Sequence, residues 1–447
     1  MRKRVLYLAI FILLLCLSGV TYAAPATITP GTEWYDTSSN PIAAQGAGVI
    51  KVGDTYYLIG MYTDNDPNNW LEVSGGHGCP LFVGITCYSS TDFANWTFEN
   101  MLLTEQPSGD LGHYRWVGRP KVIYNDTTEQ YVMYMNIDDP CVLLTQREGK
   151  VGVATCSTVN GNYTYLGSFN PLGDTVFDMT LFKDDDGKAY LITAGVNIYE
   201  LTSDYLGVSS QTTRVRDGGE APAMFKTGGV YYLLLSGSTW WTSNDNYYYT
   251  TTSLGAKQWG KTADFTPNSP DTCNSQTTYV QPIQGSSTTT FVYLGDRWDE
   301  WNFGDSTYIW QPLTLNGTTL TMDCYDEWTI DTATGEWGVP PCTVVDMHVQ
   351  SIVCSTVGGT QGMDYGQATV TINDNCGDPV ANALVDGTFS GDFSETFYDV
   401  ATDPNGDAVF VTTSQARRPS FTFCVDDVSH ATLSYDPNDN IETCDSY

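Results

Sequence analysis

One structural unit recurs along the first two thirds of this chain: a short apolar strand, a polar turn and a second strand rich in aromatic residues. The copies follow one another at steps of 75, 58, 42 and 60 residues, counted between the starts of their second strands. A β unit repeated at such intervals is the signature of propeller blades. The repeat therefore predicts an all-β fold, a five-bladed β-propeller with four strands in each blade. The second strands begin at Tyr56, Tyr131, Ala189, Tyr231 and Phe291.

The repeat ends near Trp337, and a different β pattern follows. Residues 24–337 are expected to form the propeller, and residues 338–345, which are rich in proline, a linker. Residues 346–447 contain short strand-like runs separated by Asp, Asn and Gly turns, which predicts a small immunoglobulin-like β-sandwich. Its expected role is that of a spacer or a surface-attachment module. The strand-like runs are 368–372, 407–411 and 421–425.

The N-terminus has the three parts of a secretory signal peptide. A basic start (residues 1–4) precedes an apolar run (residues 5–20) and a small-residue cleavage site that ends at Ala23. Residues 1–23 are therefore expected to be removed and the mature protein to be secreted. The apolar run is short for a bilayer span, and no later stretch could serve, so no membrane insertion is expected.

The charge balance and the cysteines limit the partners and cofactors. The chain carries 52 acidic and 19 basic side chains, a surface that repels nucleic acid and suits an uncharged polysaccharide or oligosaccharide. Of twelve cysteines only Cys16 leaves with the signal, so disulfides are expected and at least one cysteine stays unpaired. No Cys/His set has zinc-site spacing. The run from Asp184 to Gly187 lacks calcium-loop spacing and fits a hairpin turn, so no cofactor is predicted, with calcium left open.

Polar residues stand at nearly the same distance before each aromatic strand. In a propeller the first strand of each blade lines the central axis, so these positions converge at one mouth of the channel. Polar groups clustered on an apolar axis require a reason, and a binding or catalytic site is the natural one. The five residues are Gln45, Arg119, Asp178, Glu220 and Gln276, which stand 11, 12, 11, 11 and 15 residues before their strands.

The segments around these residues resemble glycoside hydrolase family 43. The run from Gly219 to Gly237 is similar to the acid-bearing blade of that family, and the run that begins at Phe177 resembles the blade before it. The run from Tyr88 to Trp96 resembles a further strand and turn of the family. Three other runs narrow the resemblance, and together the segments are similar to the exo-β-1,3-galactanase branch over about residues 30–335. These three are Arg119 to Asn125, Asn274 to Thr277 and Gly295 to Trp298.

The resemblance implies a site that hydrolyses an O-glycosidic bond. Glu220 would be the general acid that protonates the departing oxygen, and Asp178 would raise its pKa and orient it. Most members of the family invert, with an Asp base in the first blade, but this chain has Gln45 followed by Gly-Ala-Gly there. The galactanase branch shares that absence, and the resemblance implies that Gln276 holds the attacking water. Because an amide is a poor base, Gln276 would act as an imidic-acid tautomer or by positioning the water.

Substrate contacts are predicted for Gln45, Arg119, Trp241 and Trp298. The indole rings could stack on sugar rings, as could that of Trp240, although aromatic residues in propellers more often pack between blades. Arg119 could instead neutralise the axial carboxylates. The galactanase branch carries His, Glu, Glu and His at four positions expected to contact the sugar. This chain has Gln45, Met61, Gly118 and Asn136 at those positions.

Three functions fit these residues. The first is exo-acting hydrolysis of β-1,3-galactan, as in arabinogalactan degradation, with inversion. The second is an arabinofuranosidase or xylosidase of the same family, against which the missing first-blade Asp counts. The third is a catalytically inactive glycan-binding propeller. Glu220 and Asp178 count against the third, because binding alone needs no proton donor. We expect the first function.

Overall fold

The chain divides between Pro340 and Pro341 into two compact units, each with an apolar core of its own. The predicted signal peptide, residues 1–23, lies outside the residues that the structure describes. No helix among the described residues is long and apolar enough to cross a bilayer. The computed structural model describes residues 25–64, 81–139, 147–215, 218–262, 264–299 and 302–447.

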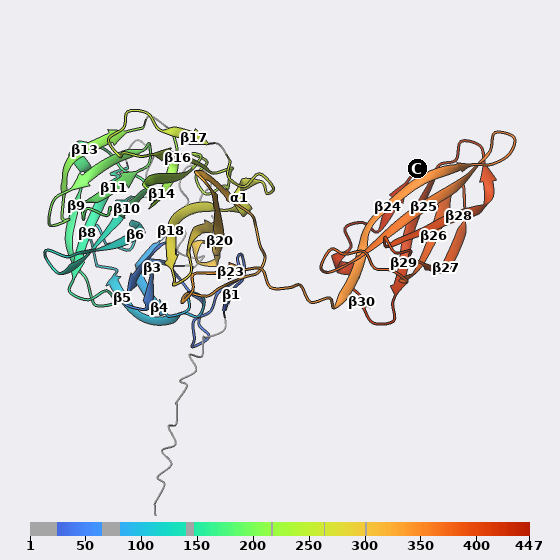
Figure 1. Ribbon diagram of the computed structural model, residues 1–447, viewed down its shortest axis with the longest axis horizontal. Helices are drawn as coiled ribbons and strands as arrows, with labels where there is room; N and C mark the ends of the chain where they lie inside the picture. The colour runs from blue at the N-terminus through green and yellow to red at the C-terminus, as the bar shows by residue number, and fades with distance from the viewer. Residues whose placement is uncertain (1–24, 65–80, 140–146, 216–217, 263, 300–301) are drawn as a thin grey trace, which may run out of the picture. The chain divides into compact units, whose positions relative to one another are not determined.

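Five four-stranded antiparallel sheets, I to V, make up most of the first unit, and in each sheet the strands pair in chain order. Figure 1 shows the sheets following one another round this unit, from the blue strands through green to yellow. Each sheet contains one copy of the sequence repeat, whose aromatic strand is the second strand of the sheet. The all-β prediction is confirmed.

The strand bounds of the five sheets are as follows. Sheet I has β2 (Gln45–Val52), β3 (Thr55–Asp64), β4 (Leu81–Ser90) and β5 (Thr97–Thr104). Sheet II has β6 (Trp116–Asn125), β7 (Gln130–Asp138), β8 (Lys150–Cys156) and β9 (Thr164–Phe169). Sheet III has β10 (Met179–Lys183), β11 (Ala189–Thr193), β12 (Asn197–Leu201) and β13 (Val208–Arg214). Sheet IV has β14 (Glu220–Thr227), β15 (Val230–Ser236), β16 (Tyr247–Thr251) and β17 (Gly260–Thr262). Sheet V has β18 (Gln276–Gln284), β19 (Thr289–Arg297), β20 (Thr307–Asn316) and β21 (Thr319–Met322).

Apolar side chains fill the spaces between consecutive sheets. One cluster joins sheets I and II around Met133, and others join II to III around Tyr199, III to IV around Leu233, and IV to V around Phe225. A further cluster, around Trp310, packs sheet V against sheet I. The five sheets therefore form a closed ring. Each large side chain buried in these clusters contributes roughly 1.5–3 kcal/mol relative to exposure, which explains why the repeat keeps aromatic and branched residues in its second strand.

A small three-stranded sheet joins the two ends of the first unit. β1 (Ala26–Ile28) pairs antiparallel with β22 (Trp328–Ile330), which pairs with β23 (Trp337–Gly338). Trp328 is completely buried, and its Nε1 donates a hydrogen bond to the Trp310 carbonyl oxygen at 2.8 Å. This sheet anchors both ends of the unit to the interface between sheets V and I.

A single left-handed turn, α1 (Asp271–Asn274), leads into β18. All four of its residues have φ between 52° and 58°. L-residues lose roughly 1–2 kcal/mol each in this conformation, so the turn needs support from outside. A disulfide between Cys273 and Cys324 ties it to the chain after β21, and the Thr272 hydroxyl donates to the Asn244 carbonyl oxygen at 3.1 Å.

Removal of this disulfide is expected to destabilise the first unit strongly. The bond joins residues 51 positions apart, for which the loop-entropy relation gives about 4 kcal/mol. We expect a Cys273→Ala/Cys324→Ala variant to lose this much of the first unit's unfolding free energy in a urea titration. The control is Cys424→Ala/Cys444→Ala, which removes a disulfide of the second unit. An unchanged first-unit transition in the former variant would contradict the expectation.

The second unit contains two four-stranded sheets that share one apolar core, which includes Val370, Phe410 and Phe423. The strand orders are β28-β25-β24-β30 and β27-β26-β29-β31. The three strand-like runs found in the sequence lie within β25, β28 and β29. The strands are β24 (Asp346–Gly358), β25 (Asp364–Asp374), β26 (Leu384–Gly391), β27 (Glu395–Ala401), β28 (Asp407–Ala416), β29 (Phe421–Ser429), β30 (Ser434–Tyr435) and β31 (Cys444–Ser446).

Three disulfides join cysteines in the described part of the chain, which is typical of an extracellular protein. Free thiols remain on Cys87, Cys156 and Cys354, while Cys79 and Cys141 lie outside the described residues. The disulfides are Cys273–Cys324, Cys342–Cys376 and Cys424–Cys444.

The short 3-10 turns are η2 (Pro171–Gly173), η3 (Phe303–Asp305) and η4 (Pro437–Asp439).

Candidate active site

The five axial residues lie at or near the start of the first strand of their sheets. Gln45, Glu220 and Gln276 are the first residues of β2, β14 and β18, Asp178 directly precedes β10, and Arg119 lies within β6. The first strands of neighbouring sheets contact one another all the way round the ring. The positions therefore converge at the centre, as the spacing predicted.

A β-bulge interrupts the pairing of the first strand near this point in four of the sheets. Such a bulge turns the side chain beside it in a new direction. By the strand register the counterpart of Glu220 in sheet II is Gly118, and Arg119 stands one residue further along, which accounts for its offset of 12 residues. The bulge residues with left-handed backbone are Gly46 (φ 62°), Arg119 (φ 50°) and Ala221 (φ 50°).

The carboxyl of Glu220 is half-buried between Gln276 and the turn that connects β15 to β16. The side-chain nitrogen Nε2 of Gln276 donates to its Oε1 at 3.1 Å. The backbone N–H groups of Thr239 and Trp240, in that turn, act on the carboxyl and lower its pKa, while the Thr239 N–H donates to the Gly237 carbonyl oxygen at 2.9 Å. The acid is therefore held by sheet V on one side and by its own sheet on the other.

Burial is the main cause that raises the pKa of Glu220, and the negative charge of Asp178 adds to it. The guanidinium of Arg119 and the two backbone N–H groups act in the opposite direction, and the resulting pKa is about 7. A carboxyl with this pKa still carries a proton near neutral pH. It can therefore donate that proton to a leaving group, as a general acid must.

The side-chain amide of Gln276 uses all of its hydrogen-bonding capacity. Its Oε1 accepts from Arg119 Nη2 at 2.5 Å and from Trp298 Nε1 at 2.9 Å. Its Nε2 donates to Glu220 Oε1 and to the Trp240 carbonyl oxygen at 3.0 Å. Because guanidinium and indole nitrogens only donate, the amide oxygen must face them, and the orientation of the amide is settled.

Asp178 and Arg119 form a buried ion pair beside the acid. Arg119 Nε donates to Asp178 Oδ1 at 2.7 Å, and only 3% of the arginine side chain is exposed. The second oxygen of Asp178 accepts from the backbone N–H of Ala221 at 2.9 Å. Asp178 therefore contacts the residue that follows Glu220, and Arg119 connects Asp178 to Gln276. Arg119 therefore holds the side chains of Asp178 and Gln276 in place through hydrogen bonds to both.

Four aromatic rings, from β6 and from the segments that follow β15 and β19, gather beside these polar groups. The ring of Trp241 lies 5.3 Å from that of Trp116, 5.1 Å from that of Trp298 and 4.7 Å from that of Phe303. Trp241 and Trp298 are half-buried, whereas Trp240 is 47% exposed. Trp241 and Trp298, both predicted to contact substrate, therefore lie together next to Gln276.

Gln45 is placed differently from the other predicted residues, because its side chain is completely buried. Its Nε2 donates to the Gly304 carbonyl oxygen at 3.5 Å, and its Oε1 has no partner among the described residues. Met61 and Asn136 are also buried, and Asn136 donates to the Val176 carbonyl oxygen. A substrate contact of Gln45 would require this buried side chain to become exposed. The contact therefore stays a prediction.

Two buried charged residues, Asp296 and Lys121, also lie in this region, although they were not among the site residues predicted from the sequence. Asp296, on β19, accepts the backbone N–H of Gly46 at 3.1 Å, and Lys121, on β6, donates to the carbonyl oxygen of the same glycine at 2.8 Å. Burial raises the pKa of Asp296 to about 6, against the effects of Arg119 and Lys121. Their signal in the sequence was a charged residue in or beside the apolar run of a repeat strand.

No group of three or more His, Cys, Asp or Glu side chains in the described residues is placed to hold a metal ion.

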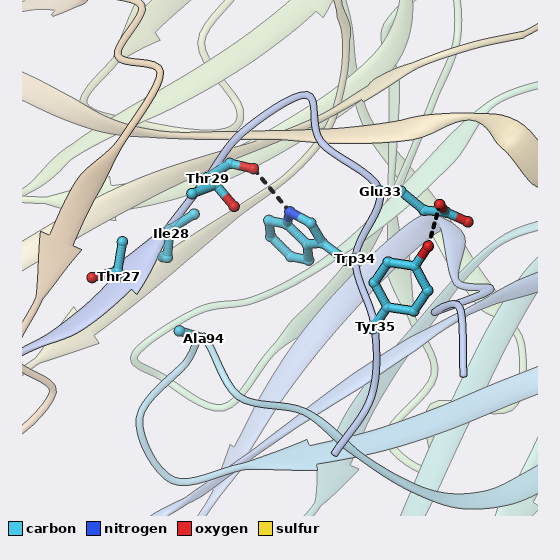
Figure 2. A pocket seen from close by; sticks show the side chains of 7 residues that line it. All are labelled: Thr27, Ile28, Thr29, Glu33, Trp34, Tyr35 and Ala94. Atoms are coloured by element: carbon cyan, nitrogen blue, oxygen red, sulfur yellow. Dashed lines mark hydrogen bonds between the residues drawn. The ribbon is translucent and has the colours of Figure 1, made fainter. Parts of the chain in front are cut away.

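A hollow of about 170 Å³ in the first unit shares none of its lining residues with the axial site. Figure 2 shows that Trp34 Nε1 in this hollow donates to Thr29, and that the Tyr35 hydroxyl donates to Glu33. The hollow is lined by Thr27, Ile28, Thr29, Glu33, Trp34, Tyr35 and Ala94.

A half-buried carboxylic acid with a near-neutral pKa, beside a second carboxylate and aromatic rings, is an arrangement typical of glycoside hydrolases. The comparison with protein-family models agrees with this class. Residues 38–311 match the model of glycosyl hydrolases family 43. The chain belongs to that family and is a glycoside hydrolase.

Several solved structures are similar to this chain. An exo-β-1,3-galactanase from Phanerochaete chrysosporium with bound galactose is 28% identical, with a TM-score of 0.65 over 88% of this chain and 94% of that one. A variant of it with β-1,3-galactotriose is 27% identical, with a TM-score of 0.65 over 91% and 96%. An exo-β-1,3-galactanase from Clostridium thermocellum is 28% identical, with a TM-score of 0.63 over 85% and 88%. A search of curated protein sequences found no match.

Proposed function

We propose that this protein is a secreted, exo-acting β-1,3-galactanase that inverts the anomeric centre, with Glu220 as general acid. The observation that carries the proposal is the half-buried Glu220 carboxyl, with a pKa of about 7, at the centre of the ring beside Asp178. The substrate is inferred from the galactanase structures, one of which holds galactose and another β-1,3-galactotriose with a glutamate replaced by glutamine. The predicted signal peptide, residues 1–23, supports secretion.

The architecture that we propose for this enzyme is a five-bladed β-propeller followed by an immunoglobulin-like sandwich. Five sheets that close into a ring, each with its first strand innermost, support the propeller. Two four-stranded sheets over a shared core, antiparallel except for the parallel β24–β30 pair, support the sandwich. The boundary between Pro340 and Pro341 separates the two.

In the proposed reaction, protonated Glu220 gives its proton to the glycosidic oxygen as the bond from that oxygen to the anomeric carbon breaks. A water molecule adds to the anomeric carbon from the opposite side, its extra proton passes to solvent, and Glu220 regains a proton from solvent. Asp178 stays charged in its pair with Arg119 and keeps the pKa of Glu220 high. Asp178 and Arg119 therefore act as positioning residues.

Gln276 is proposed to position the water through an N–H group. An imidic-acid tautomer would carry a hydrogen on Oε1, which instead accepts two hydrogen bonds from Arg119 and Trp298. The 3.1 Å contact between Gln276 Nε2 and Glu220 Oε1 is far shorter than the roughly 6.5–9.5 Å between acid and base in inverting enzymes. Entry of the sugar must therefore open this contact, which frees one N–H for the water. Trp241 and Trp298 are proposed as sugar platforms.

The pH dependence of the wild-type enzyme should follow Glu220. Its pKa is about 7, and only the protonated form can act as the acid, so kcat/KM is expected to fall about tenfold for each pH unit above that value. Initial rates from pH 5 to pH 9 measure this alkaline limb, and a melting curve at each pH serves as the control for unfolding. Rates that stay constant to pH 9 would contradict the assignment of Glu220 as acid.

The substrate proposal is tested by incubation with β-1,3-galactan, β-1,4-galactan, arabinoside and xyloside substrates, with the products separated by chromatography. The expected result is free galactose from β-1,3-galactan alone, with no early oligosaccharides. Release of arabinose or xylose would replace the galactanase assignment by one of the other family activities. Absence of any hydrolysis, together with retained binding to a glycan, would replace it by a binding function.

A further inference from the structure

We propose that Asn244 is a positioning residue for the acid: it fixes the turn of residues 237–244 so that backbone N–H groups of this turn face the Glu220 carboxyl. The inference rests on the proposed role of Glu220. The turn connects β15 to β16, and β15 ends at Ser236, which pairs with Glu220 in the sheet. The turn therefore begins directly opposite the acid.

Asn244 closes this turn with both ends of its side-chain amide. Its Oδ1 accepts the backbone N–H of Gly237 at 2.8 Å. Its Nδ2 donates to the hydroxyl of Thr239 at 2.6 Å, to the Ser236 hydroxyl at 3.0 Å and to the Gly237 carbonyl oxygen at 3.1 Å. One side chain thus holds the beginning, the middle and the end of the turn together.

The middle of the turn has a conformation that depends on such support. Trp240 has φ of 62°, a left-handed backbone that costs an ordinary residue roughly 1–2 kcal/mol. A left-handed residue in a turn lets successive N–H groups point to the same side, where they can bind an anion. Within the turn, the Thr239 hydroxyl also donates to the Thr242 carbonyl oxygen at 2.5 Å.

The turn contacts both polar side chains of the proposed reaction. The Trp240 carbonyl oxygen accepts from Gln276 Nε2 at 3.0 Å, and the N–H groups of Thr239 and Trp240 act on the Glu220 carboxyl. N–H donors favour the ionised carboxylate, so they lower the pKa of Glu220 and counteract burial. They also fix the direction in which the carboxyl presents its proton. If Asn244 loses its amide, the turn loosens, the pKa of Glu220 rises and the carboxyl loses its fixed orientation.

The test compares wild type with Asn244→Ala on β-1,3-galactan across pH 5 to 9. We expect kcat to fall about tenfold, because a small misplacement of a catalytic group has effects of this size, while KM changes little. The alkaline limb of the rate profile should move to higher pH, which a merely structural defect would not produce. The control is Asn268→Ala, whose exposed amide donates to Asp323 in another part of the first unit, with a melting curve for each variant.

A titration of ¹³C-labelled glutamate side chains by NMR reads the same effect without substrate, with Glu220→Gln used to assign the Glu220 signal. A higher pKa for Glu220 in Asn244→Ala than in wild type is the expected result. Identical titration curves and identical rate profiles in folded Asn244→Ala would overturn the positioning role of Asn244. A wild type that hydrolyses no glycoside would instead refute the proposed function, and the titration would still decide whether Asn244 positions the carboxyl.

Discussion

Glu220→Gln is expected to abolish hydrolysis of β-1,3-galactan, with kcat/KM reduced by about 10³-fold or more. The substituted amide keeps the shape of the side chain, and its oxygen can still accept the hydrogen bond from Gln276 Nε2. It cannot supply a proton to the departing oxygen. Because the half-buried carboxyl is replaced by a neutral group, the melting temperature should not fall. The measurement is galactose release by the purified variant beside wild type.

The control for this variant is Glu336→Gln, at an exposed position outside the axial site. It makes the same chemical change and should retain wild-type rates. Activity of Glu220→Gln within tenfold of wild type would mean that another group protonates the leaving oxygen. Loss of activity together with a lower melting temperature would call for repetition with Glu220→Asp, which retains an acid on a shorter side chain.

Asp178→Asn is expected to have the second largest effect, on both activity and stability. The negative charge of Asp178 raises the pKa of Glu220, so its removal should lower that pKa and move the alkaline limb of the rate profile to lower pH. The guanidinium of Arg119, with 3% of its side chain exposed, would lose its anionic partner. Breaking a buried ion pair from one side costs about 3 kcal/mol. We expect kcat to fall about 10²-fold, since the general acid is then both less protonated and less well oriented.

The matched control is Asp126→Asn, which removes an ion pair with Lys183 in which the carboxylate side chain is 73% exposed. Exposed pairs contribute less than about 1 kcal/mol, so this variant should keep its stability and its rate profile. A rate profile of Asp178→Asn that is unchanged, or that moves to higher pH, would contradict the assigned charge effect. Asp178→Asn and Asn244→Ala are thus expected to move the same limb in opposite directions.

The sheets could be predicted from the sequence because the repeat reflects the packing that a closed ring of sheets requires. Each second strand must place aromatic or branched side chains in the spaces between sheets, as Tyr199 and Phe225 do. The five polar residues stand out for a related reason: they recur at nearly the same distance before these strands. Both signals are local, so a single sequence is enough to find them.

The contacts within the site could not be predicted in the same way. The four hydrogen bonds of Gln276 join it to Arg119 and Glu220, on sheets II and IV, and to Trp240 and Trp298, in the segments that follow β15 and β19. They depend on bulges and left-handed residues that leave no fixed pattern in the sequence. The complete burial of Gln45 depends on packing against segments far along the chain, such as Gly304.

Glu220 is proposed to drive inverting, exo-acting hydrolysis of β-1,3-galactan. The most direct test follows wild-type hydrolysis of a β-1,3-galactooligosaccharide by ¹H NMR, with the reducing end labelled. We expect single galactose units to leave the non-reducing end and to appear first as the α-anomer, before mutarotation. The first appearance of β-galactose would contradict inversion. Early release of unlabelled oligosaccharides longer than one sugar unit would contradict exo action, and an unchanged substrate would contradict the galactanase assignment itself.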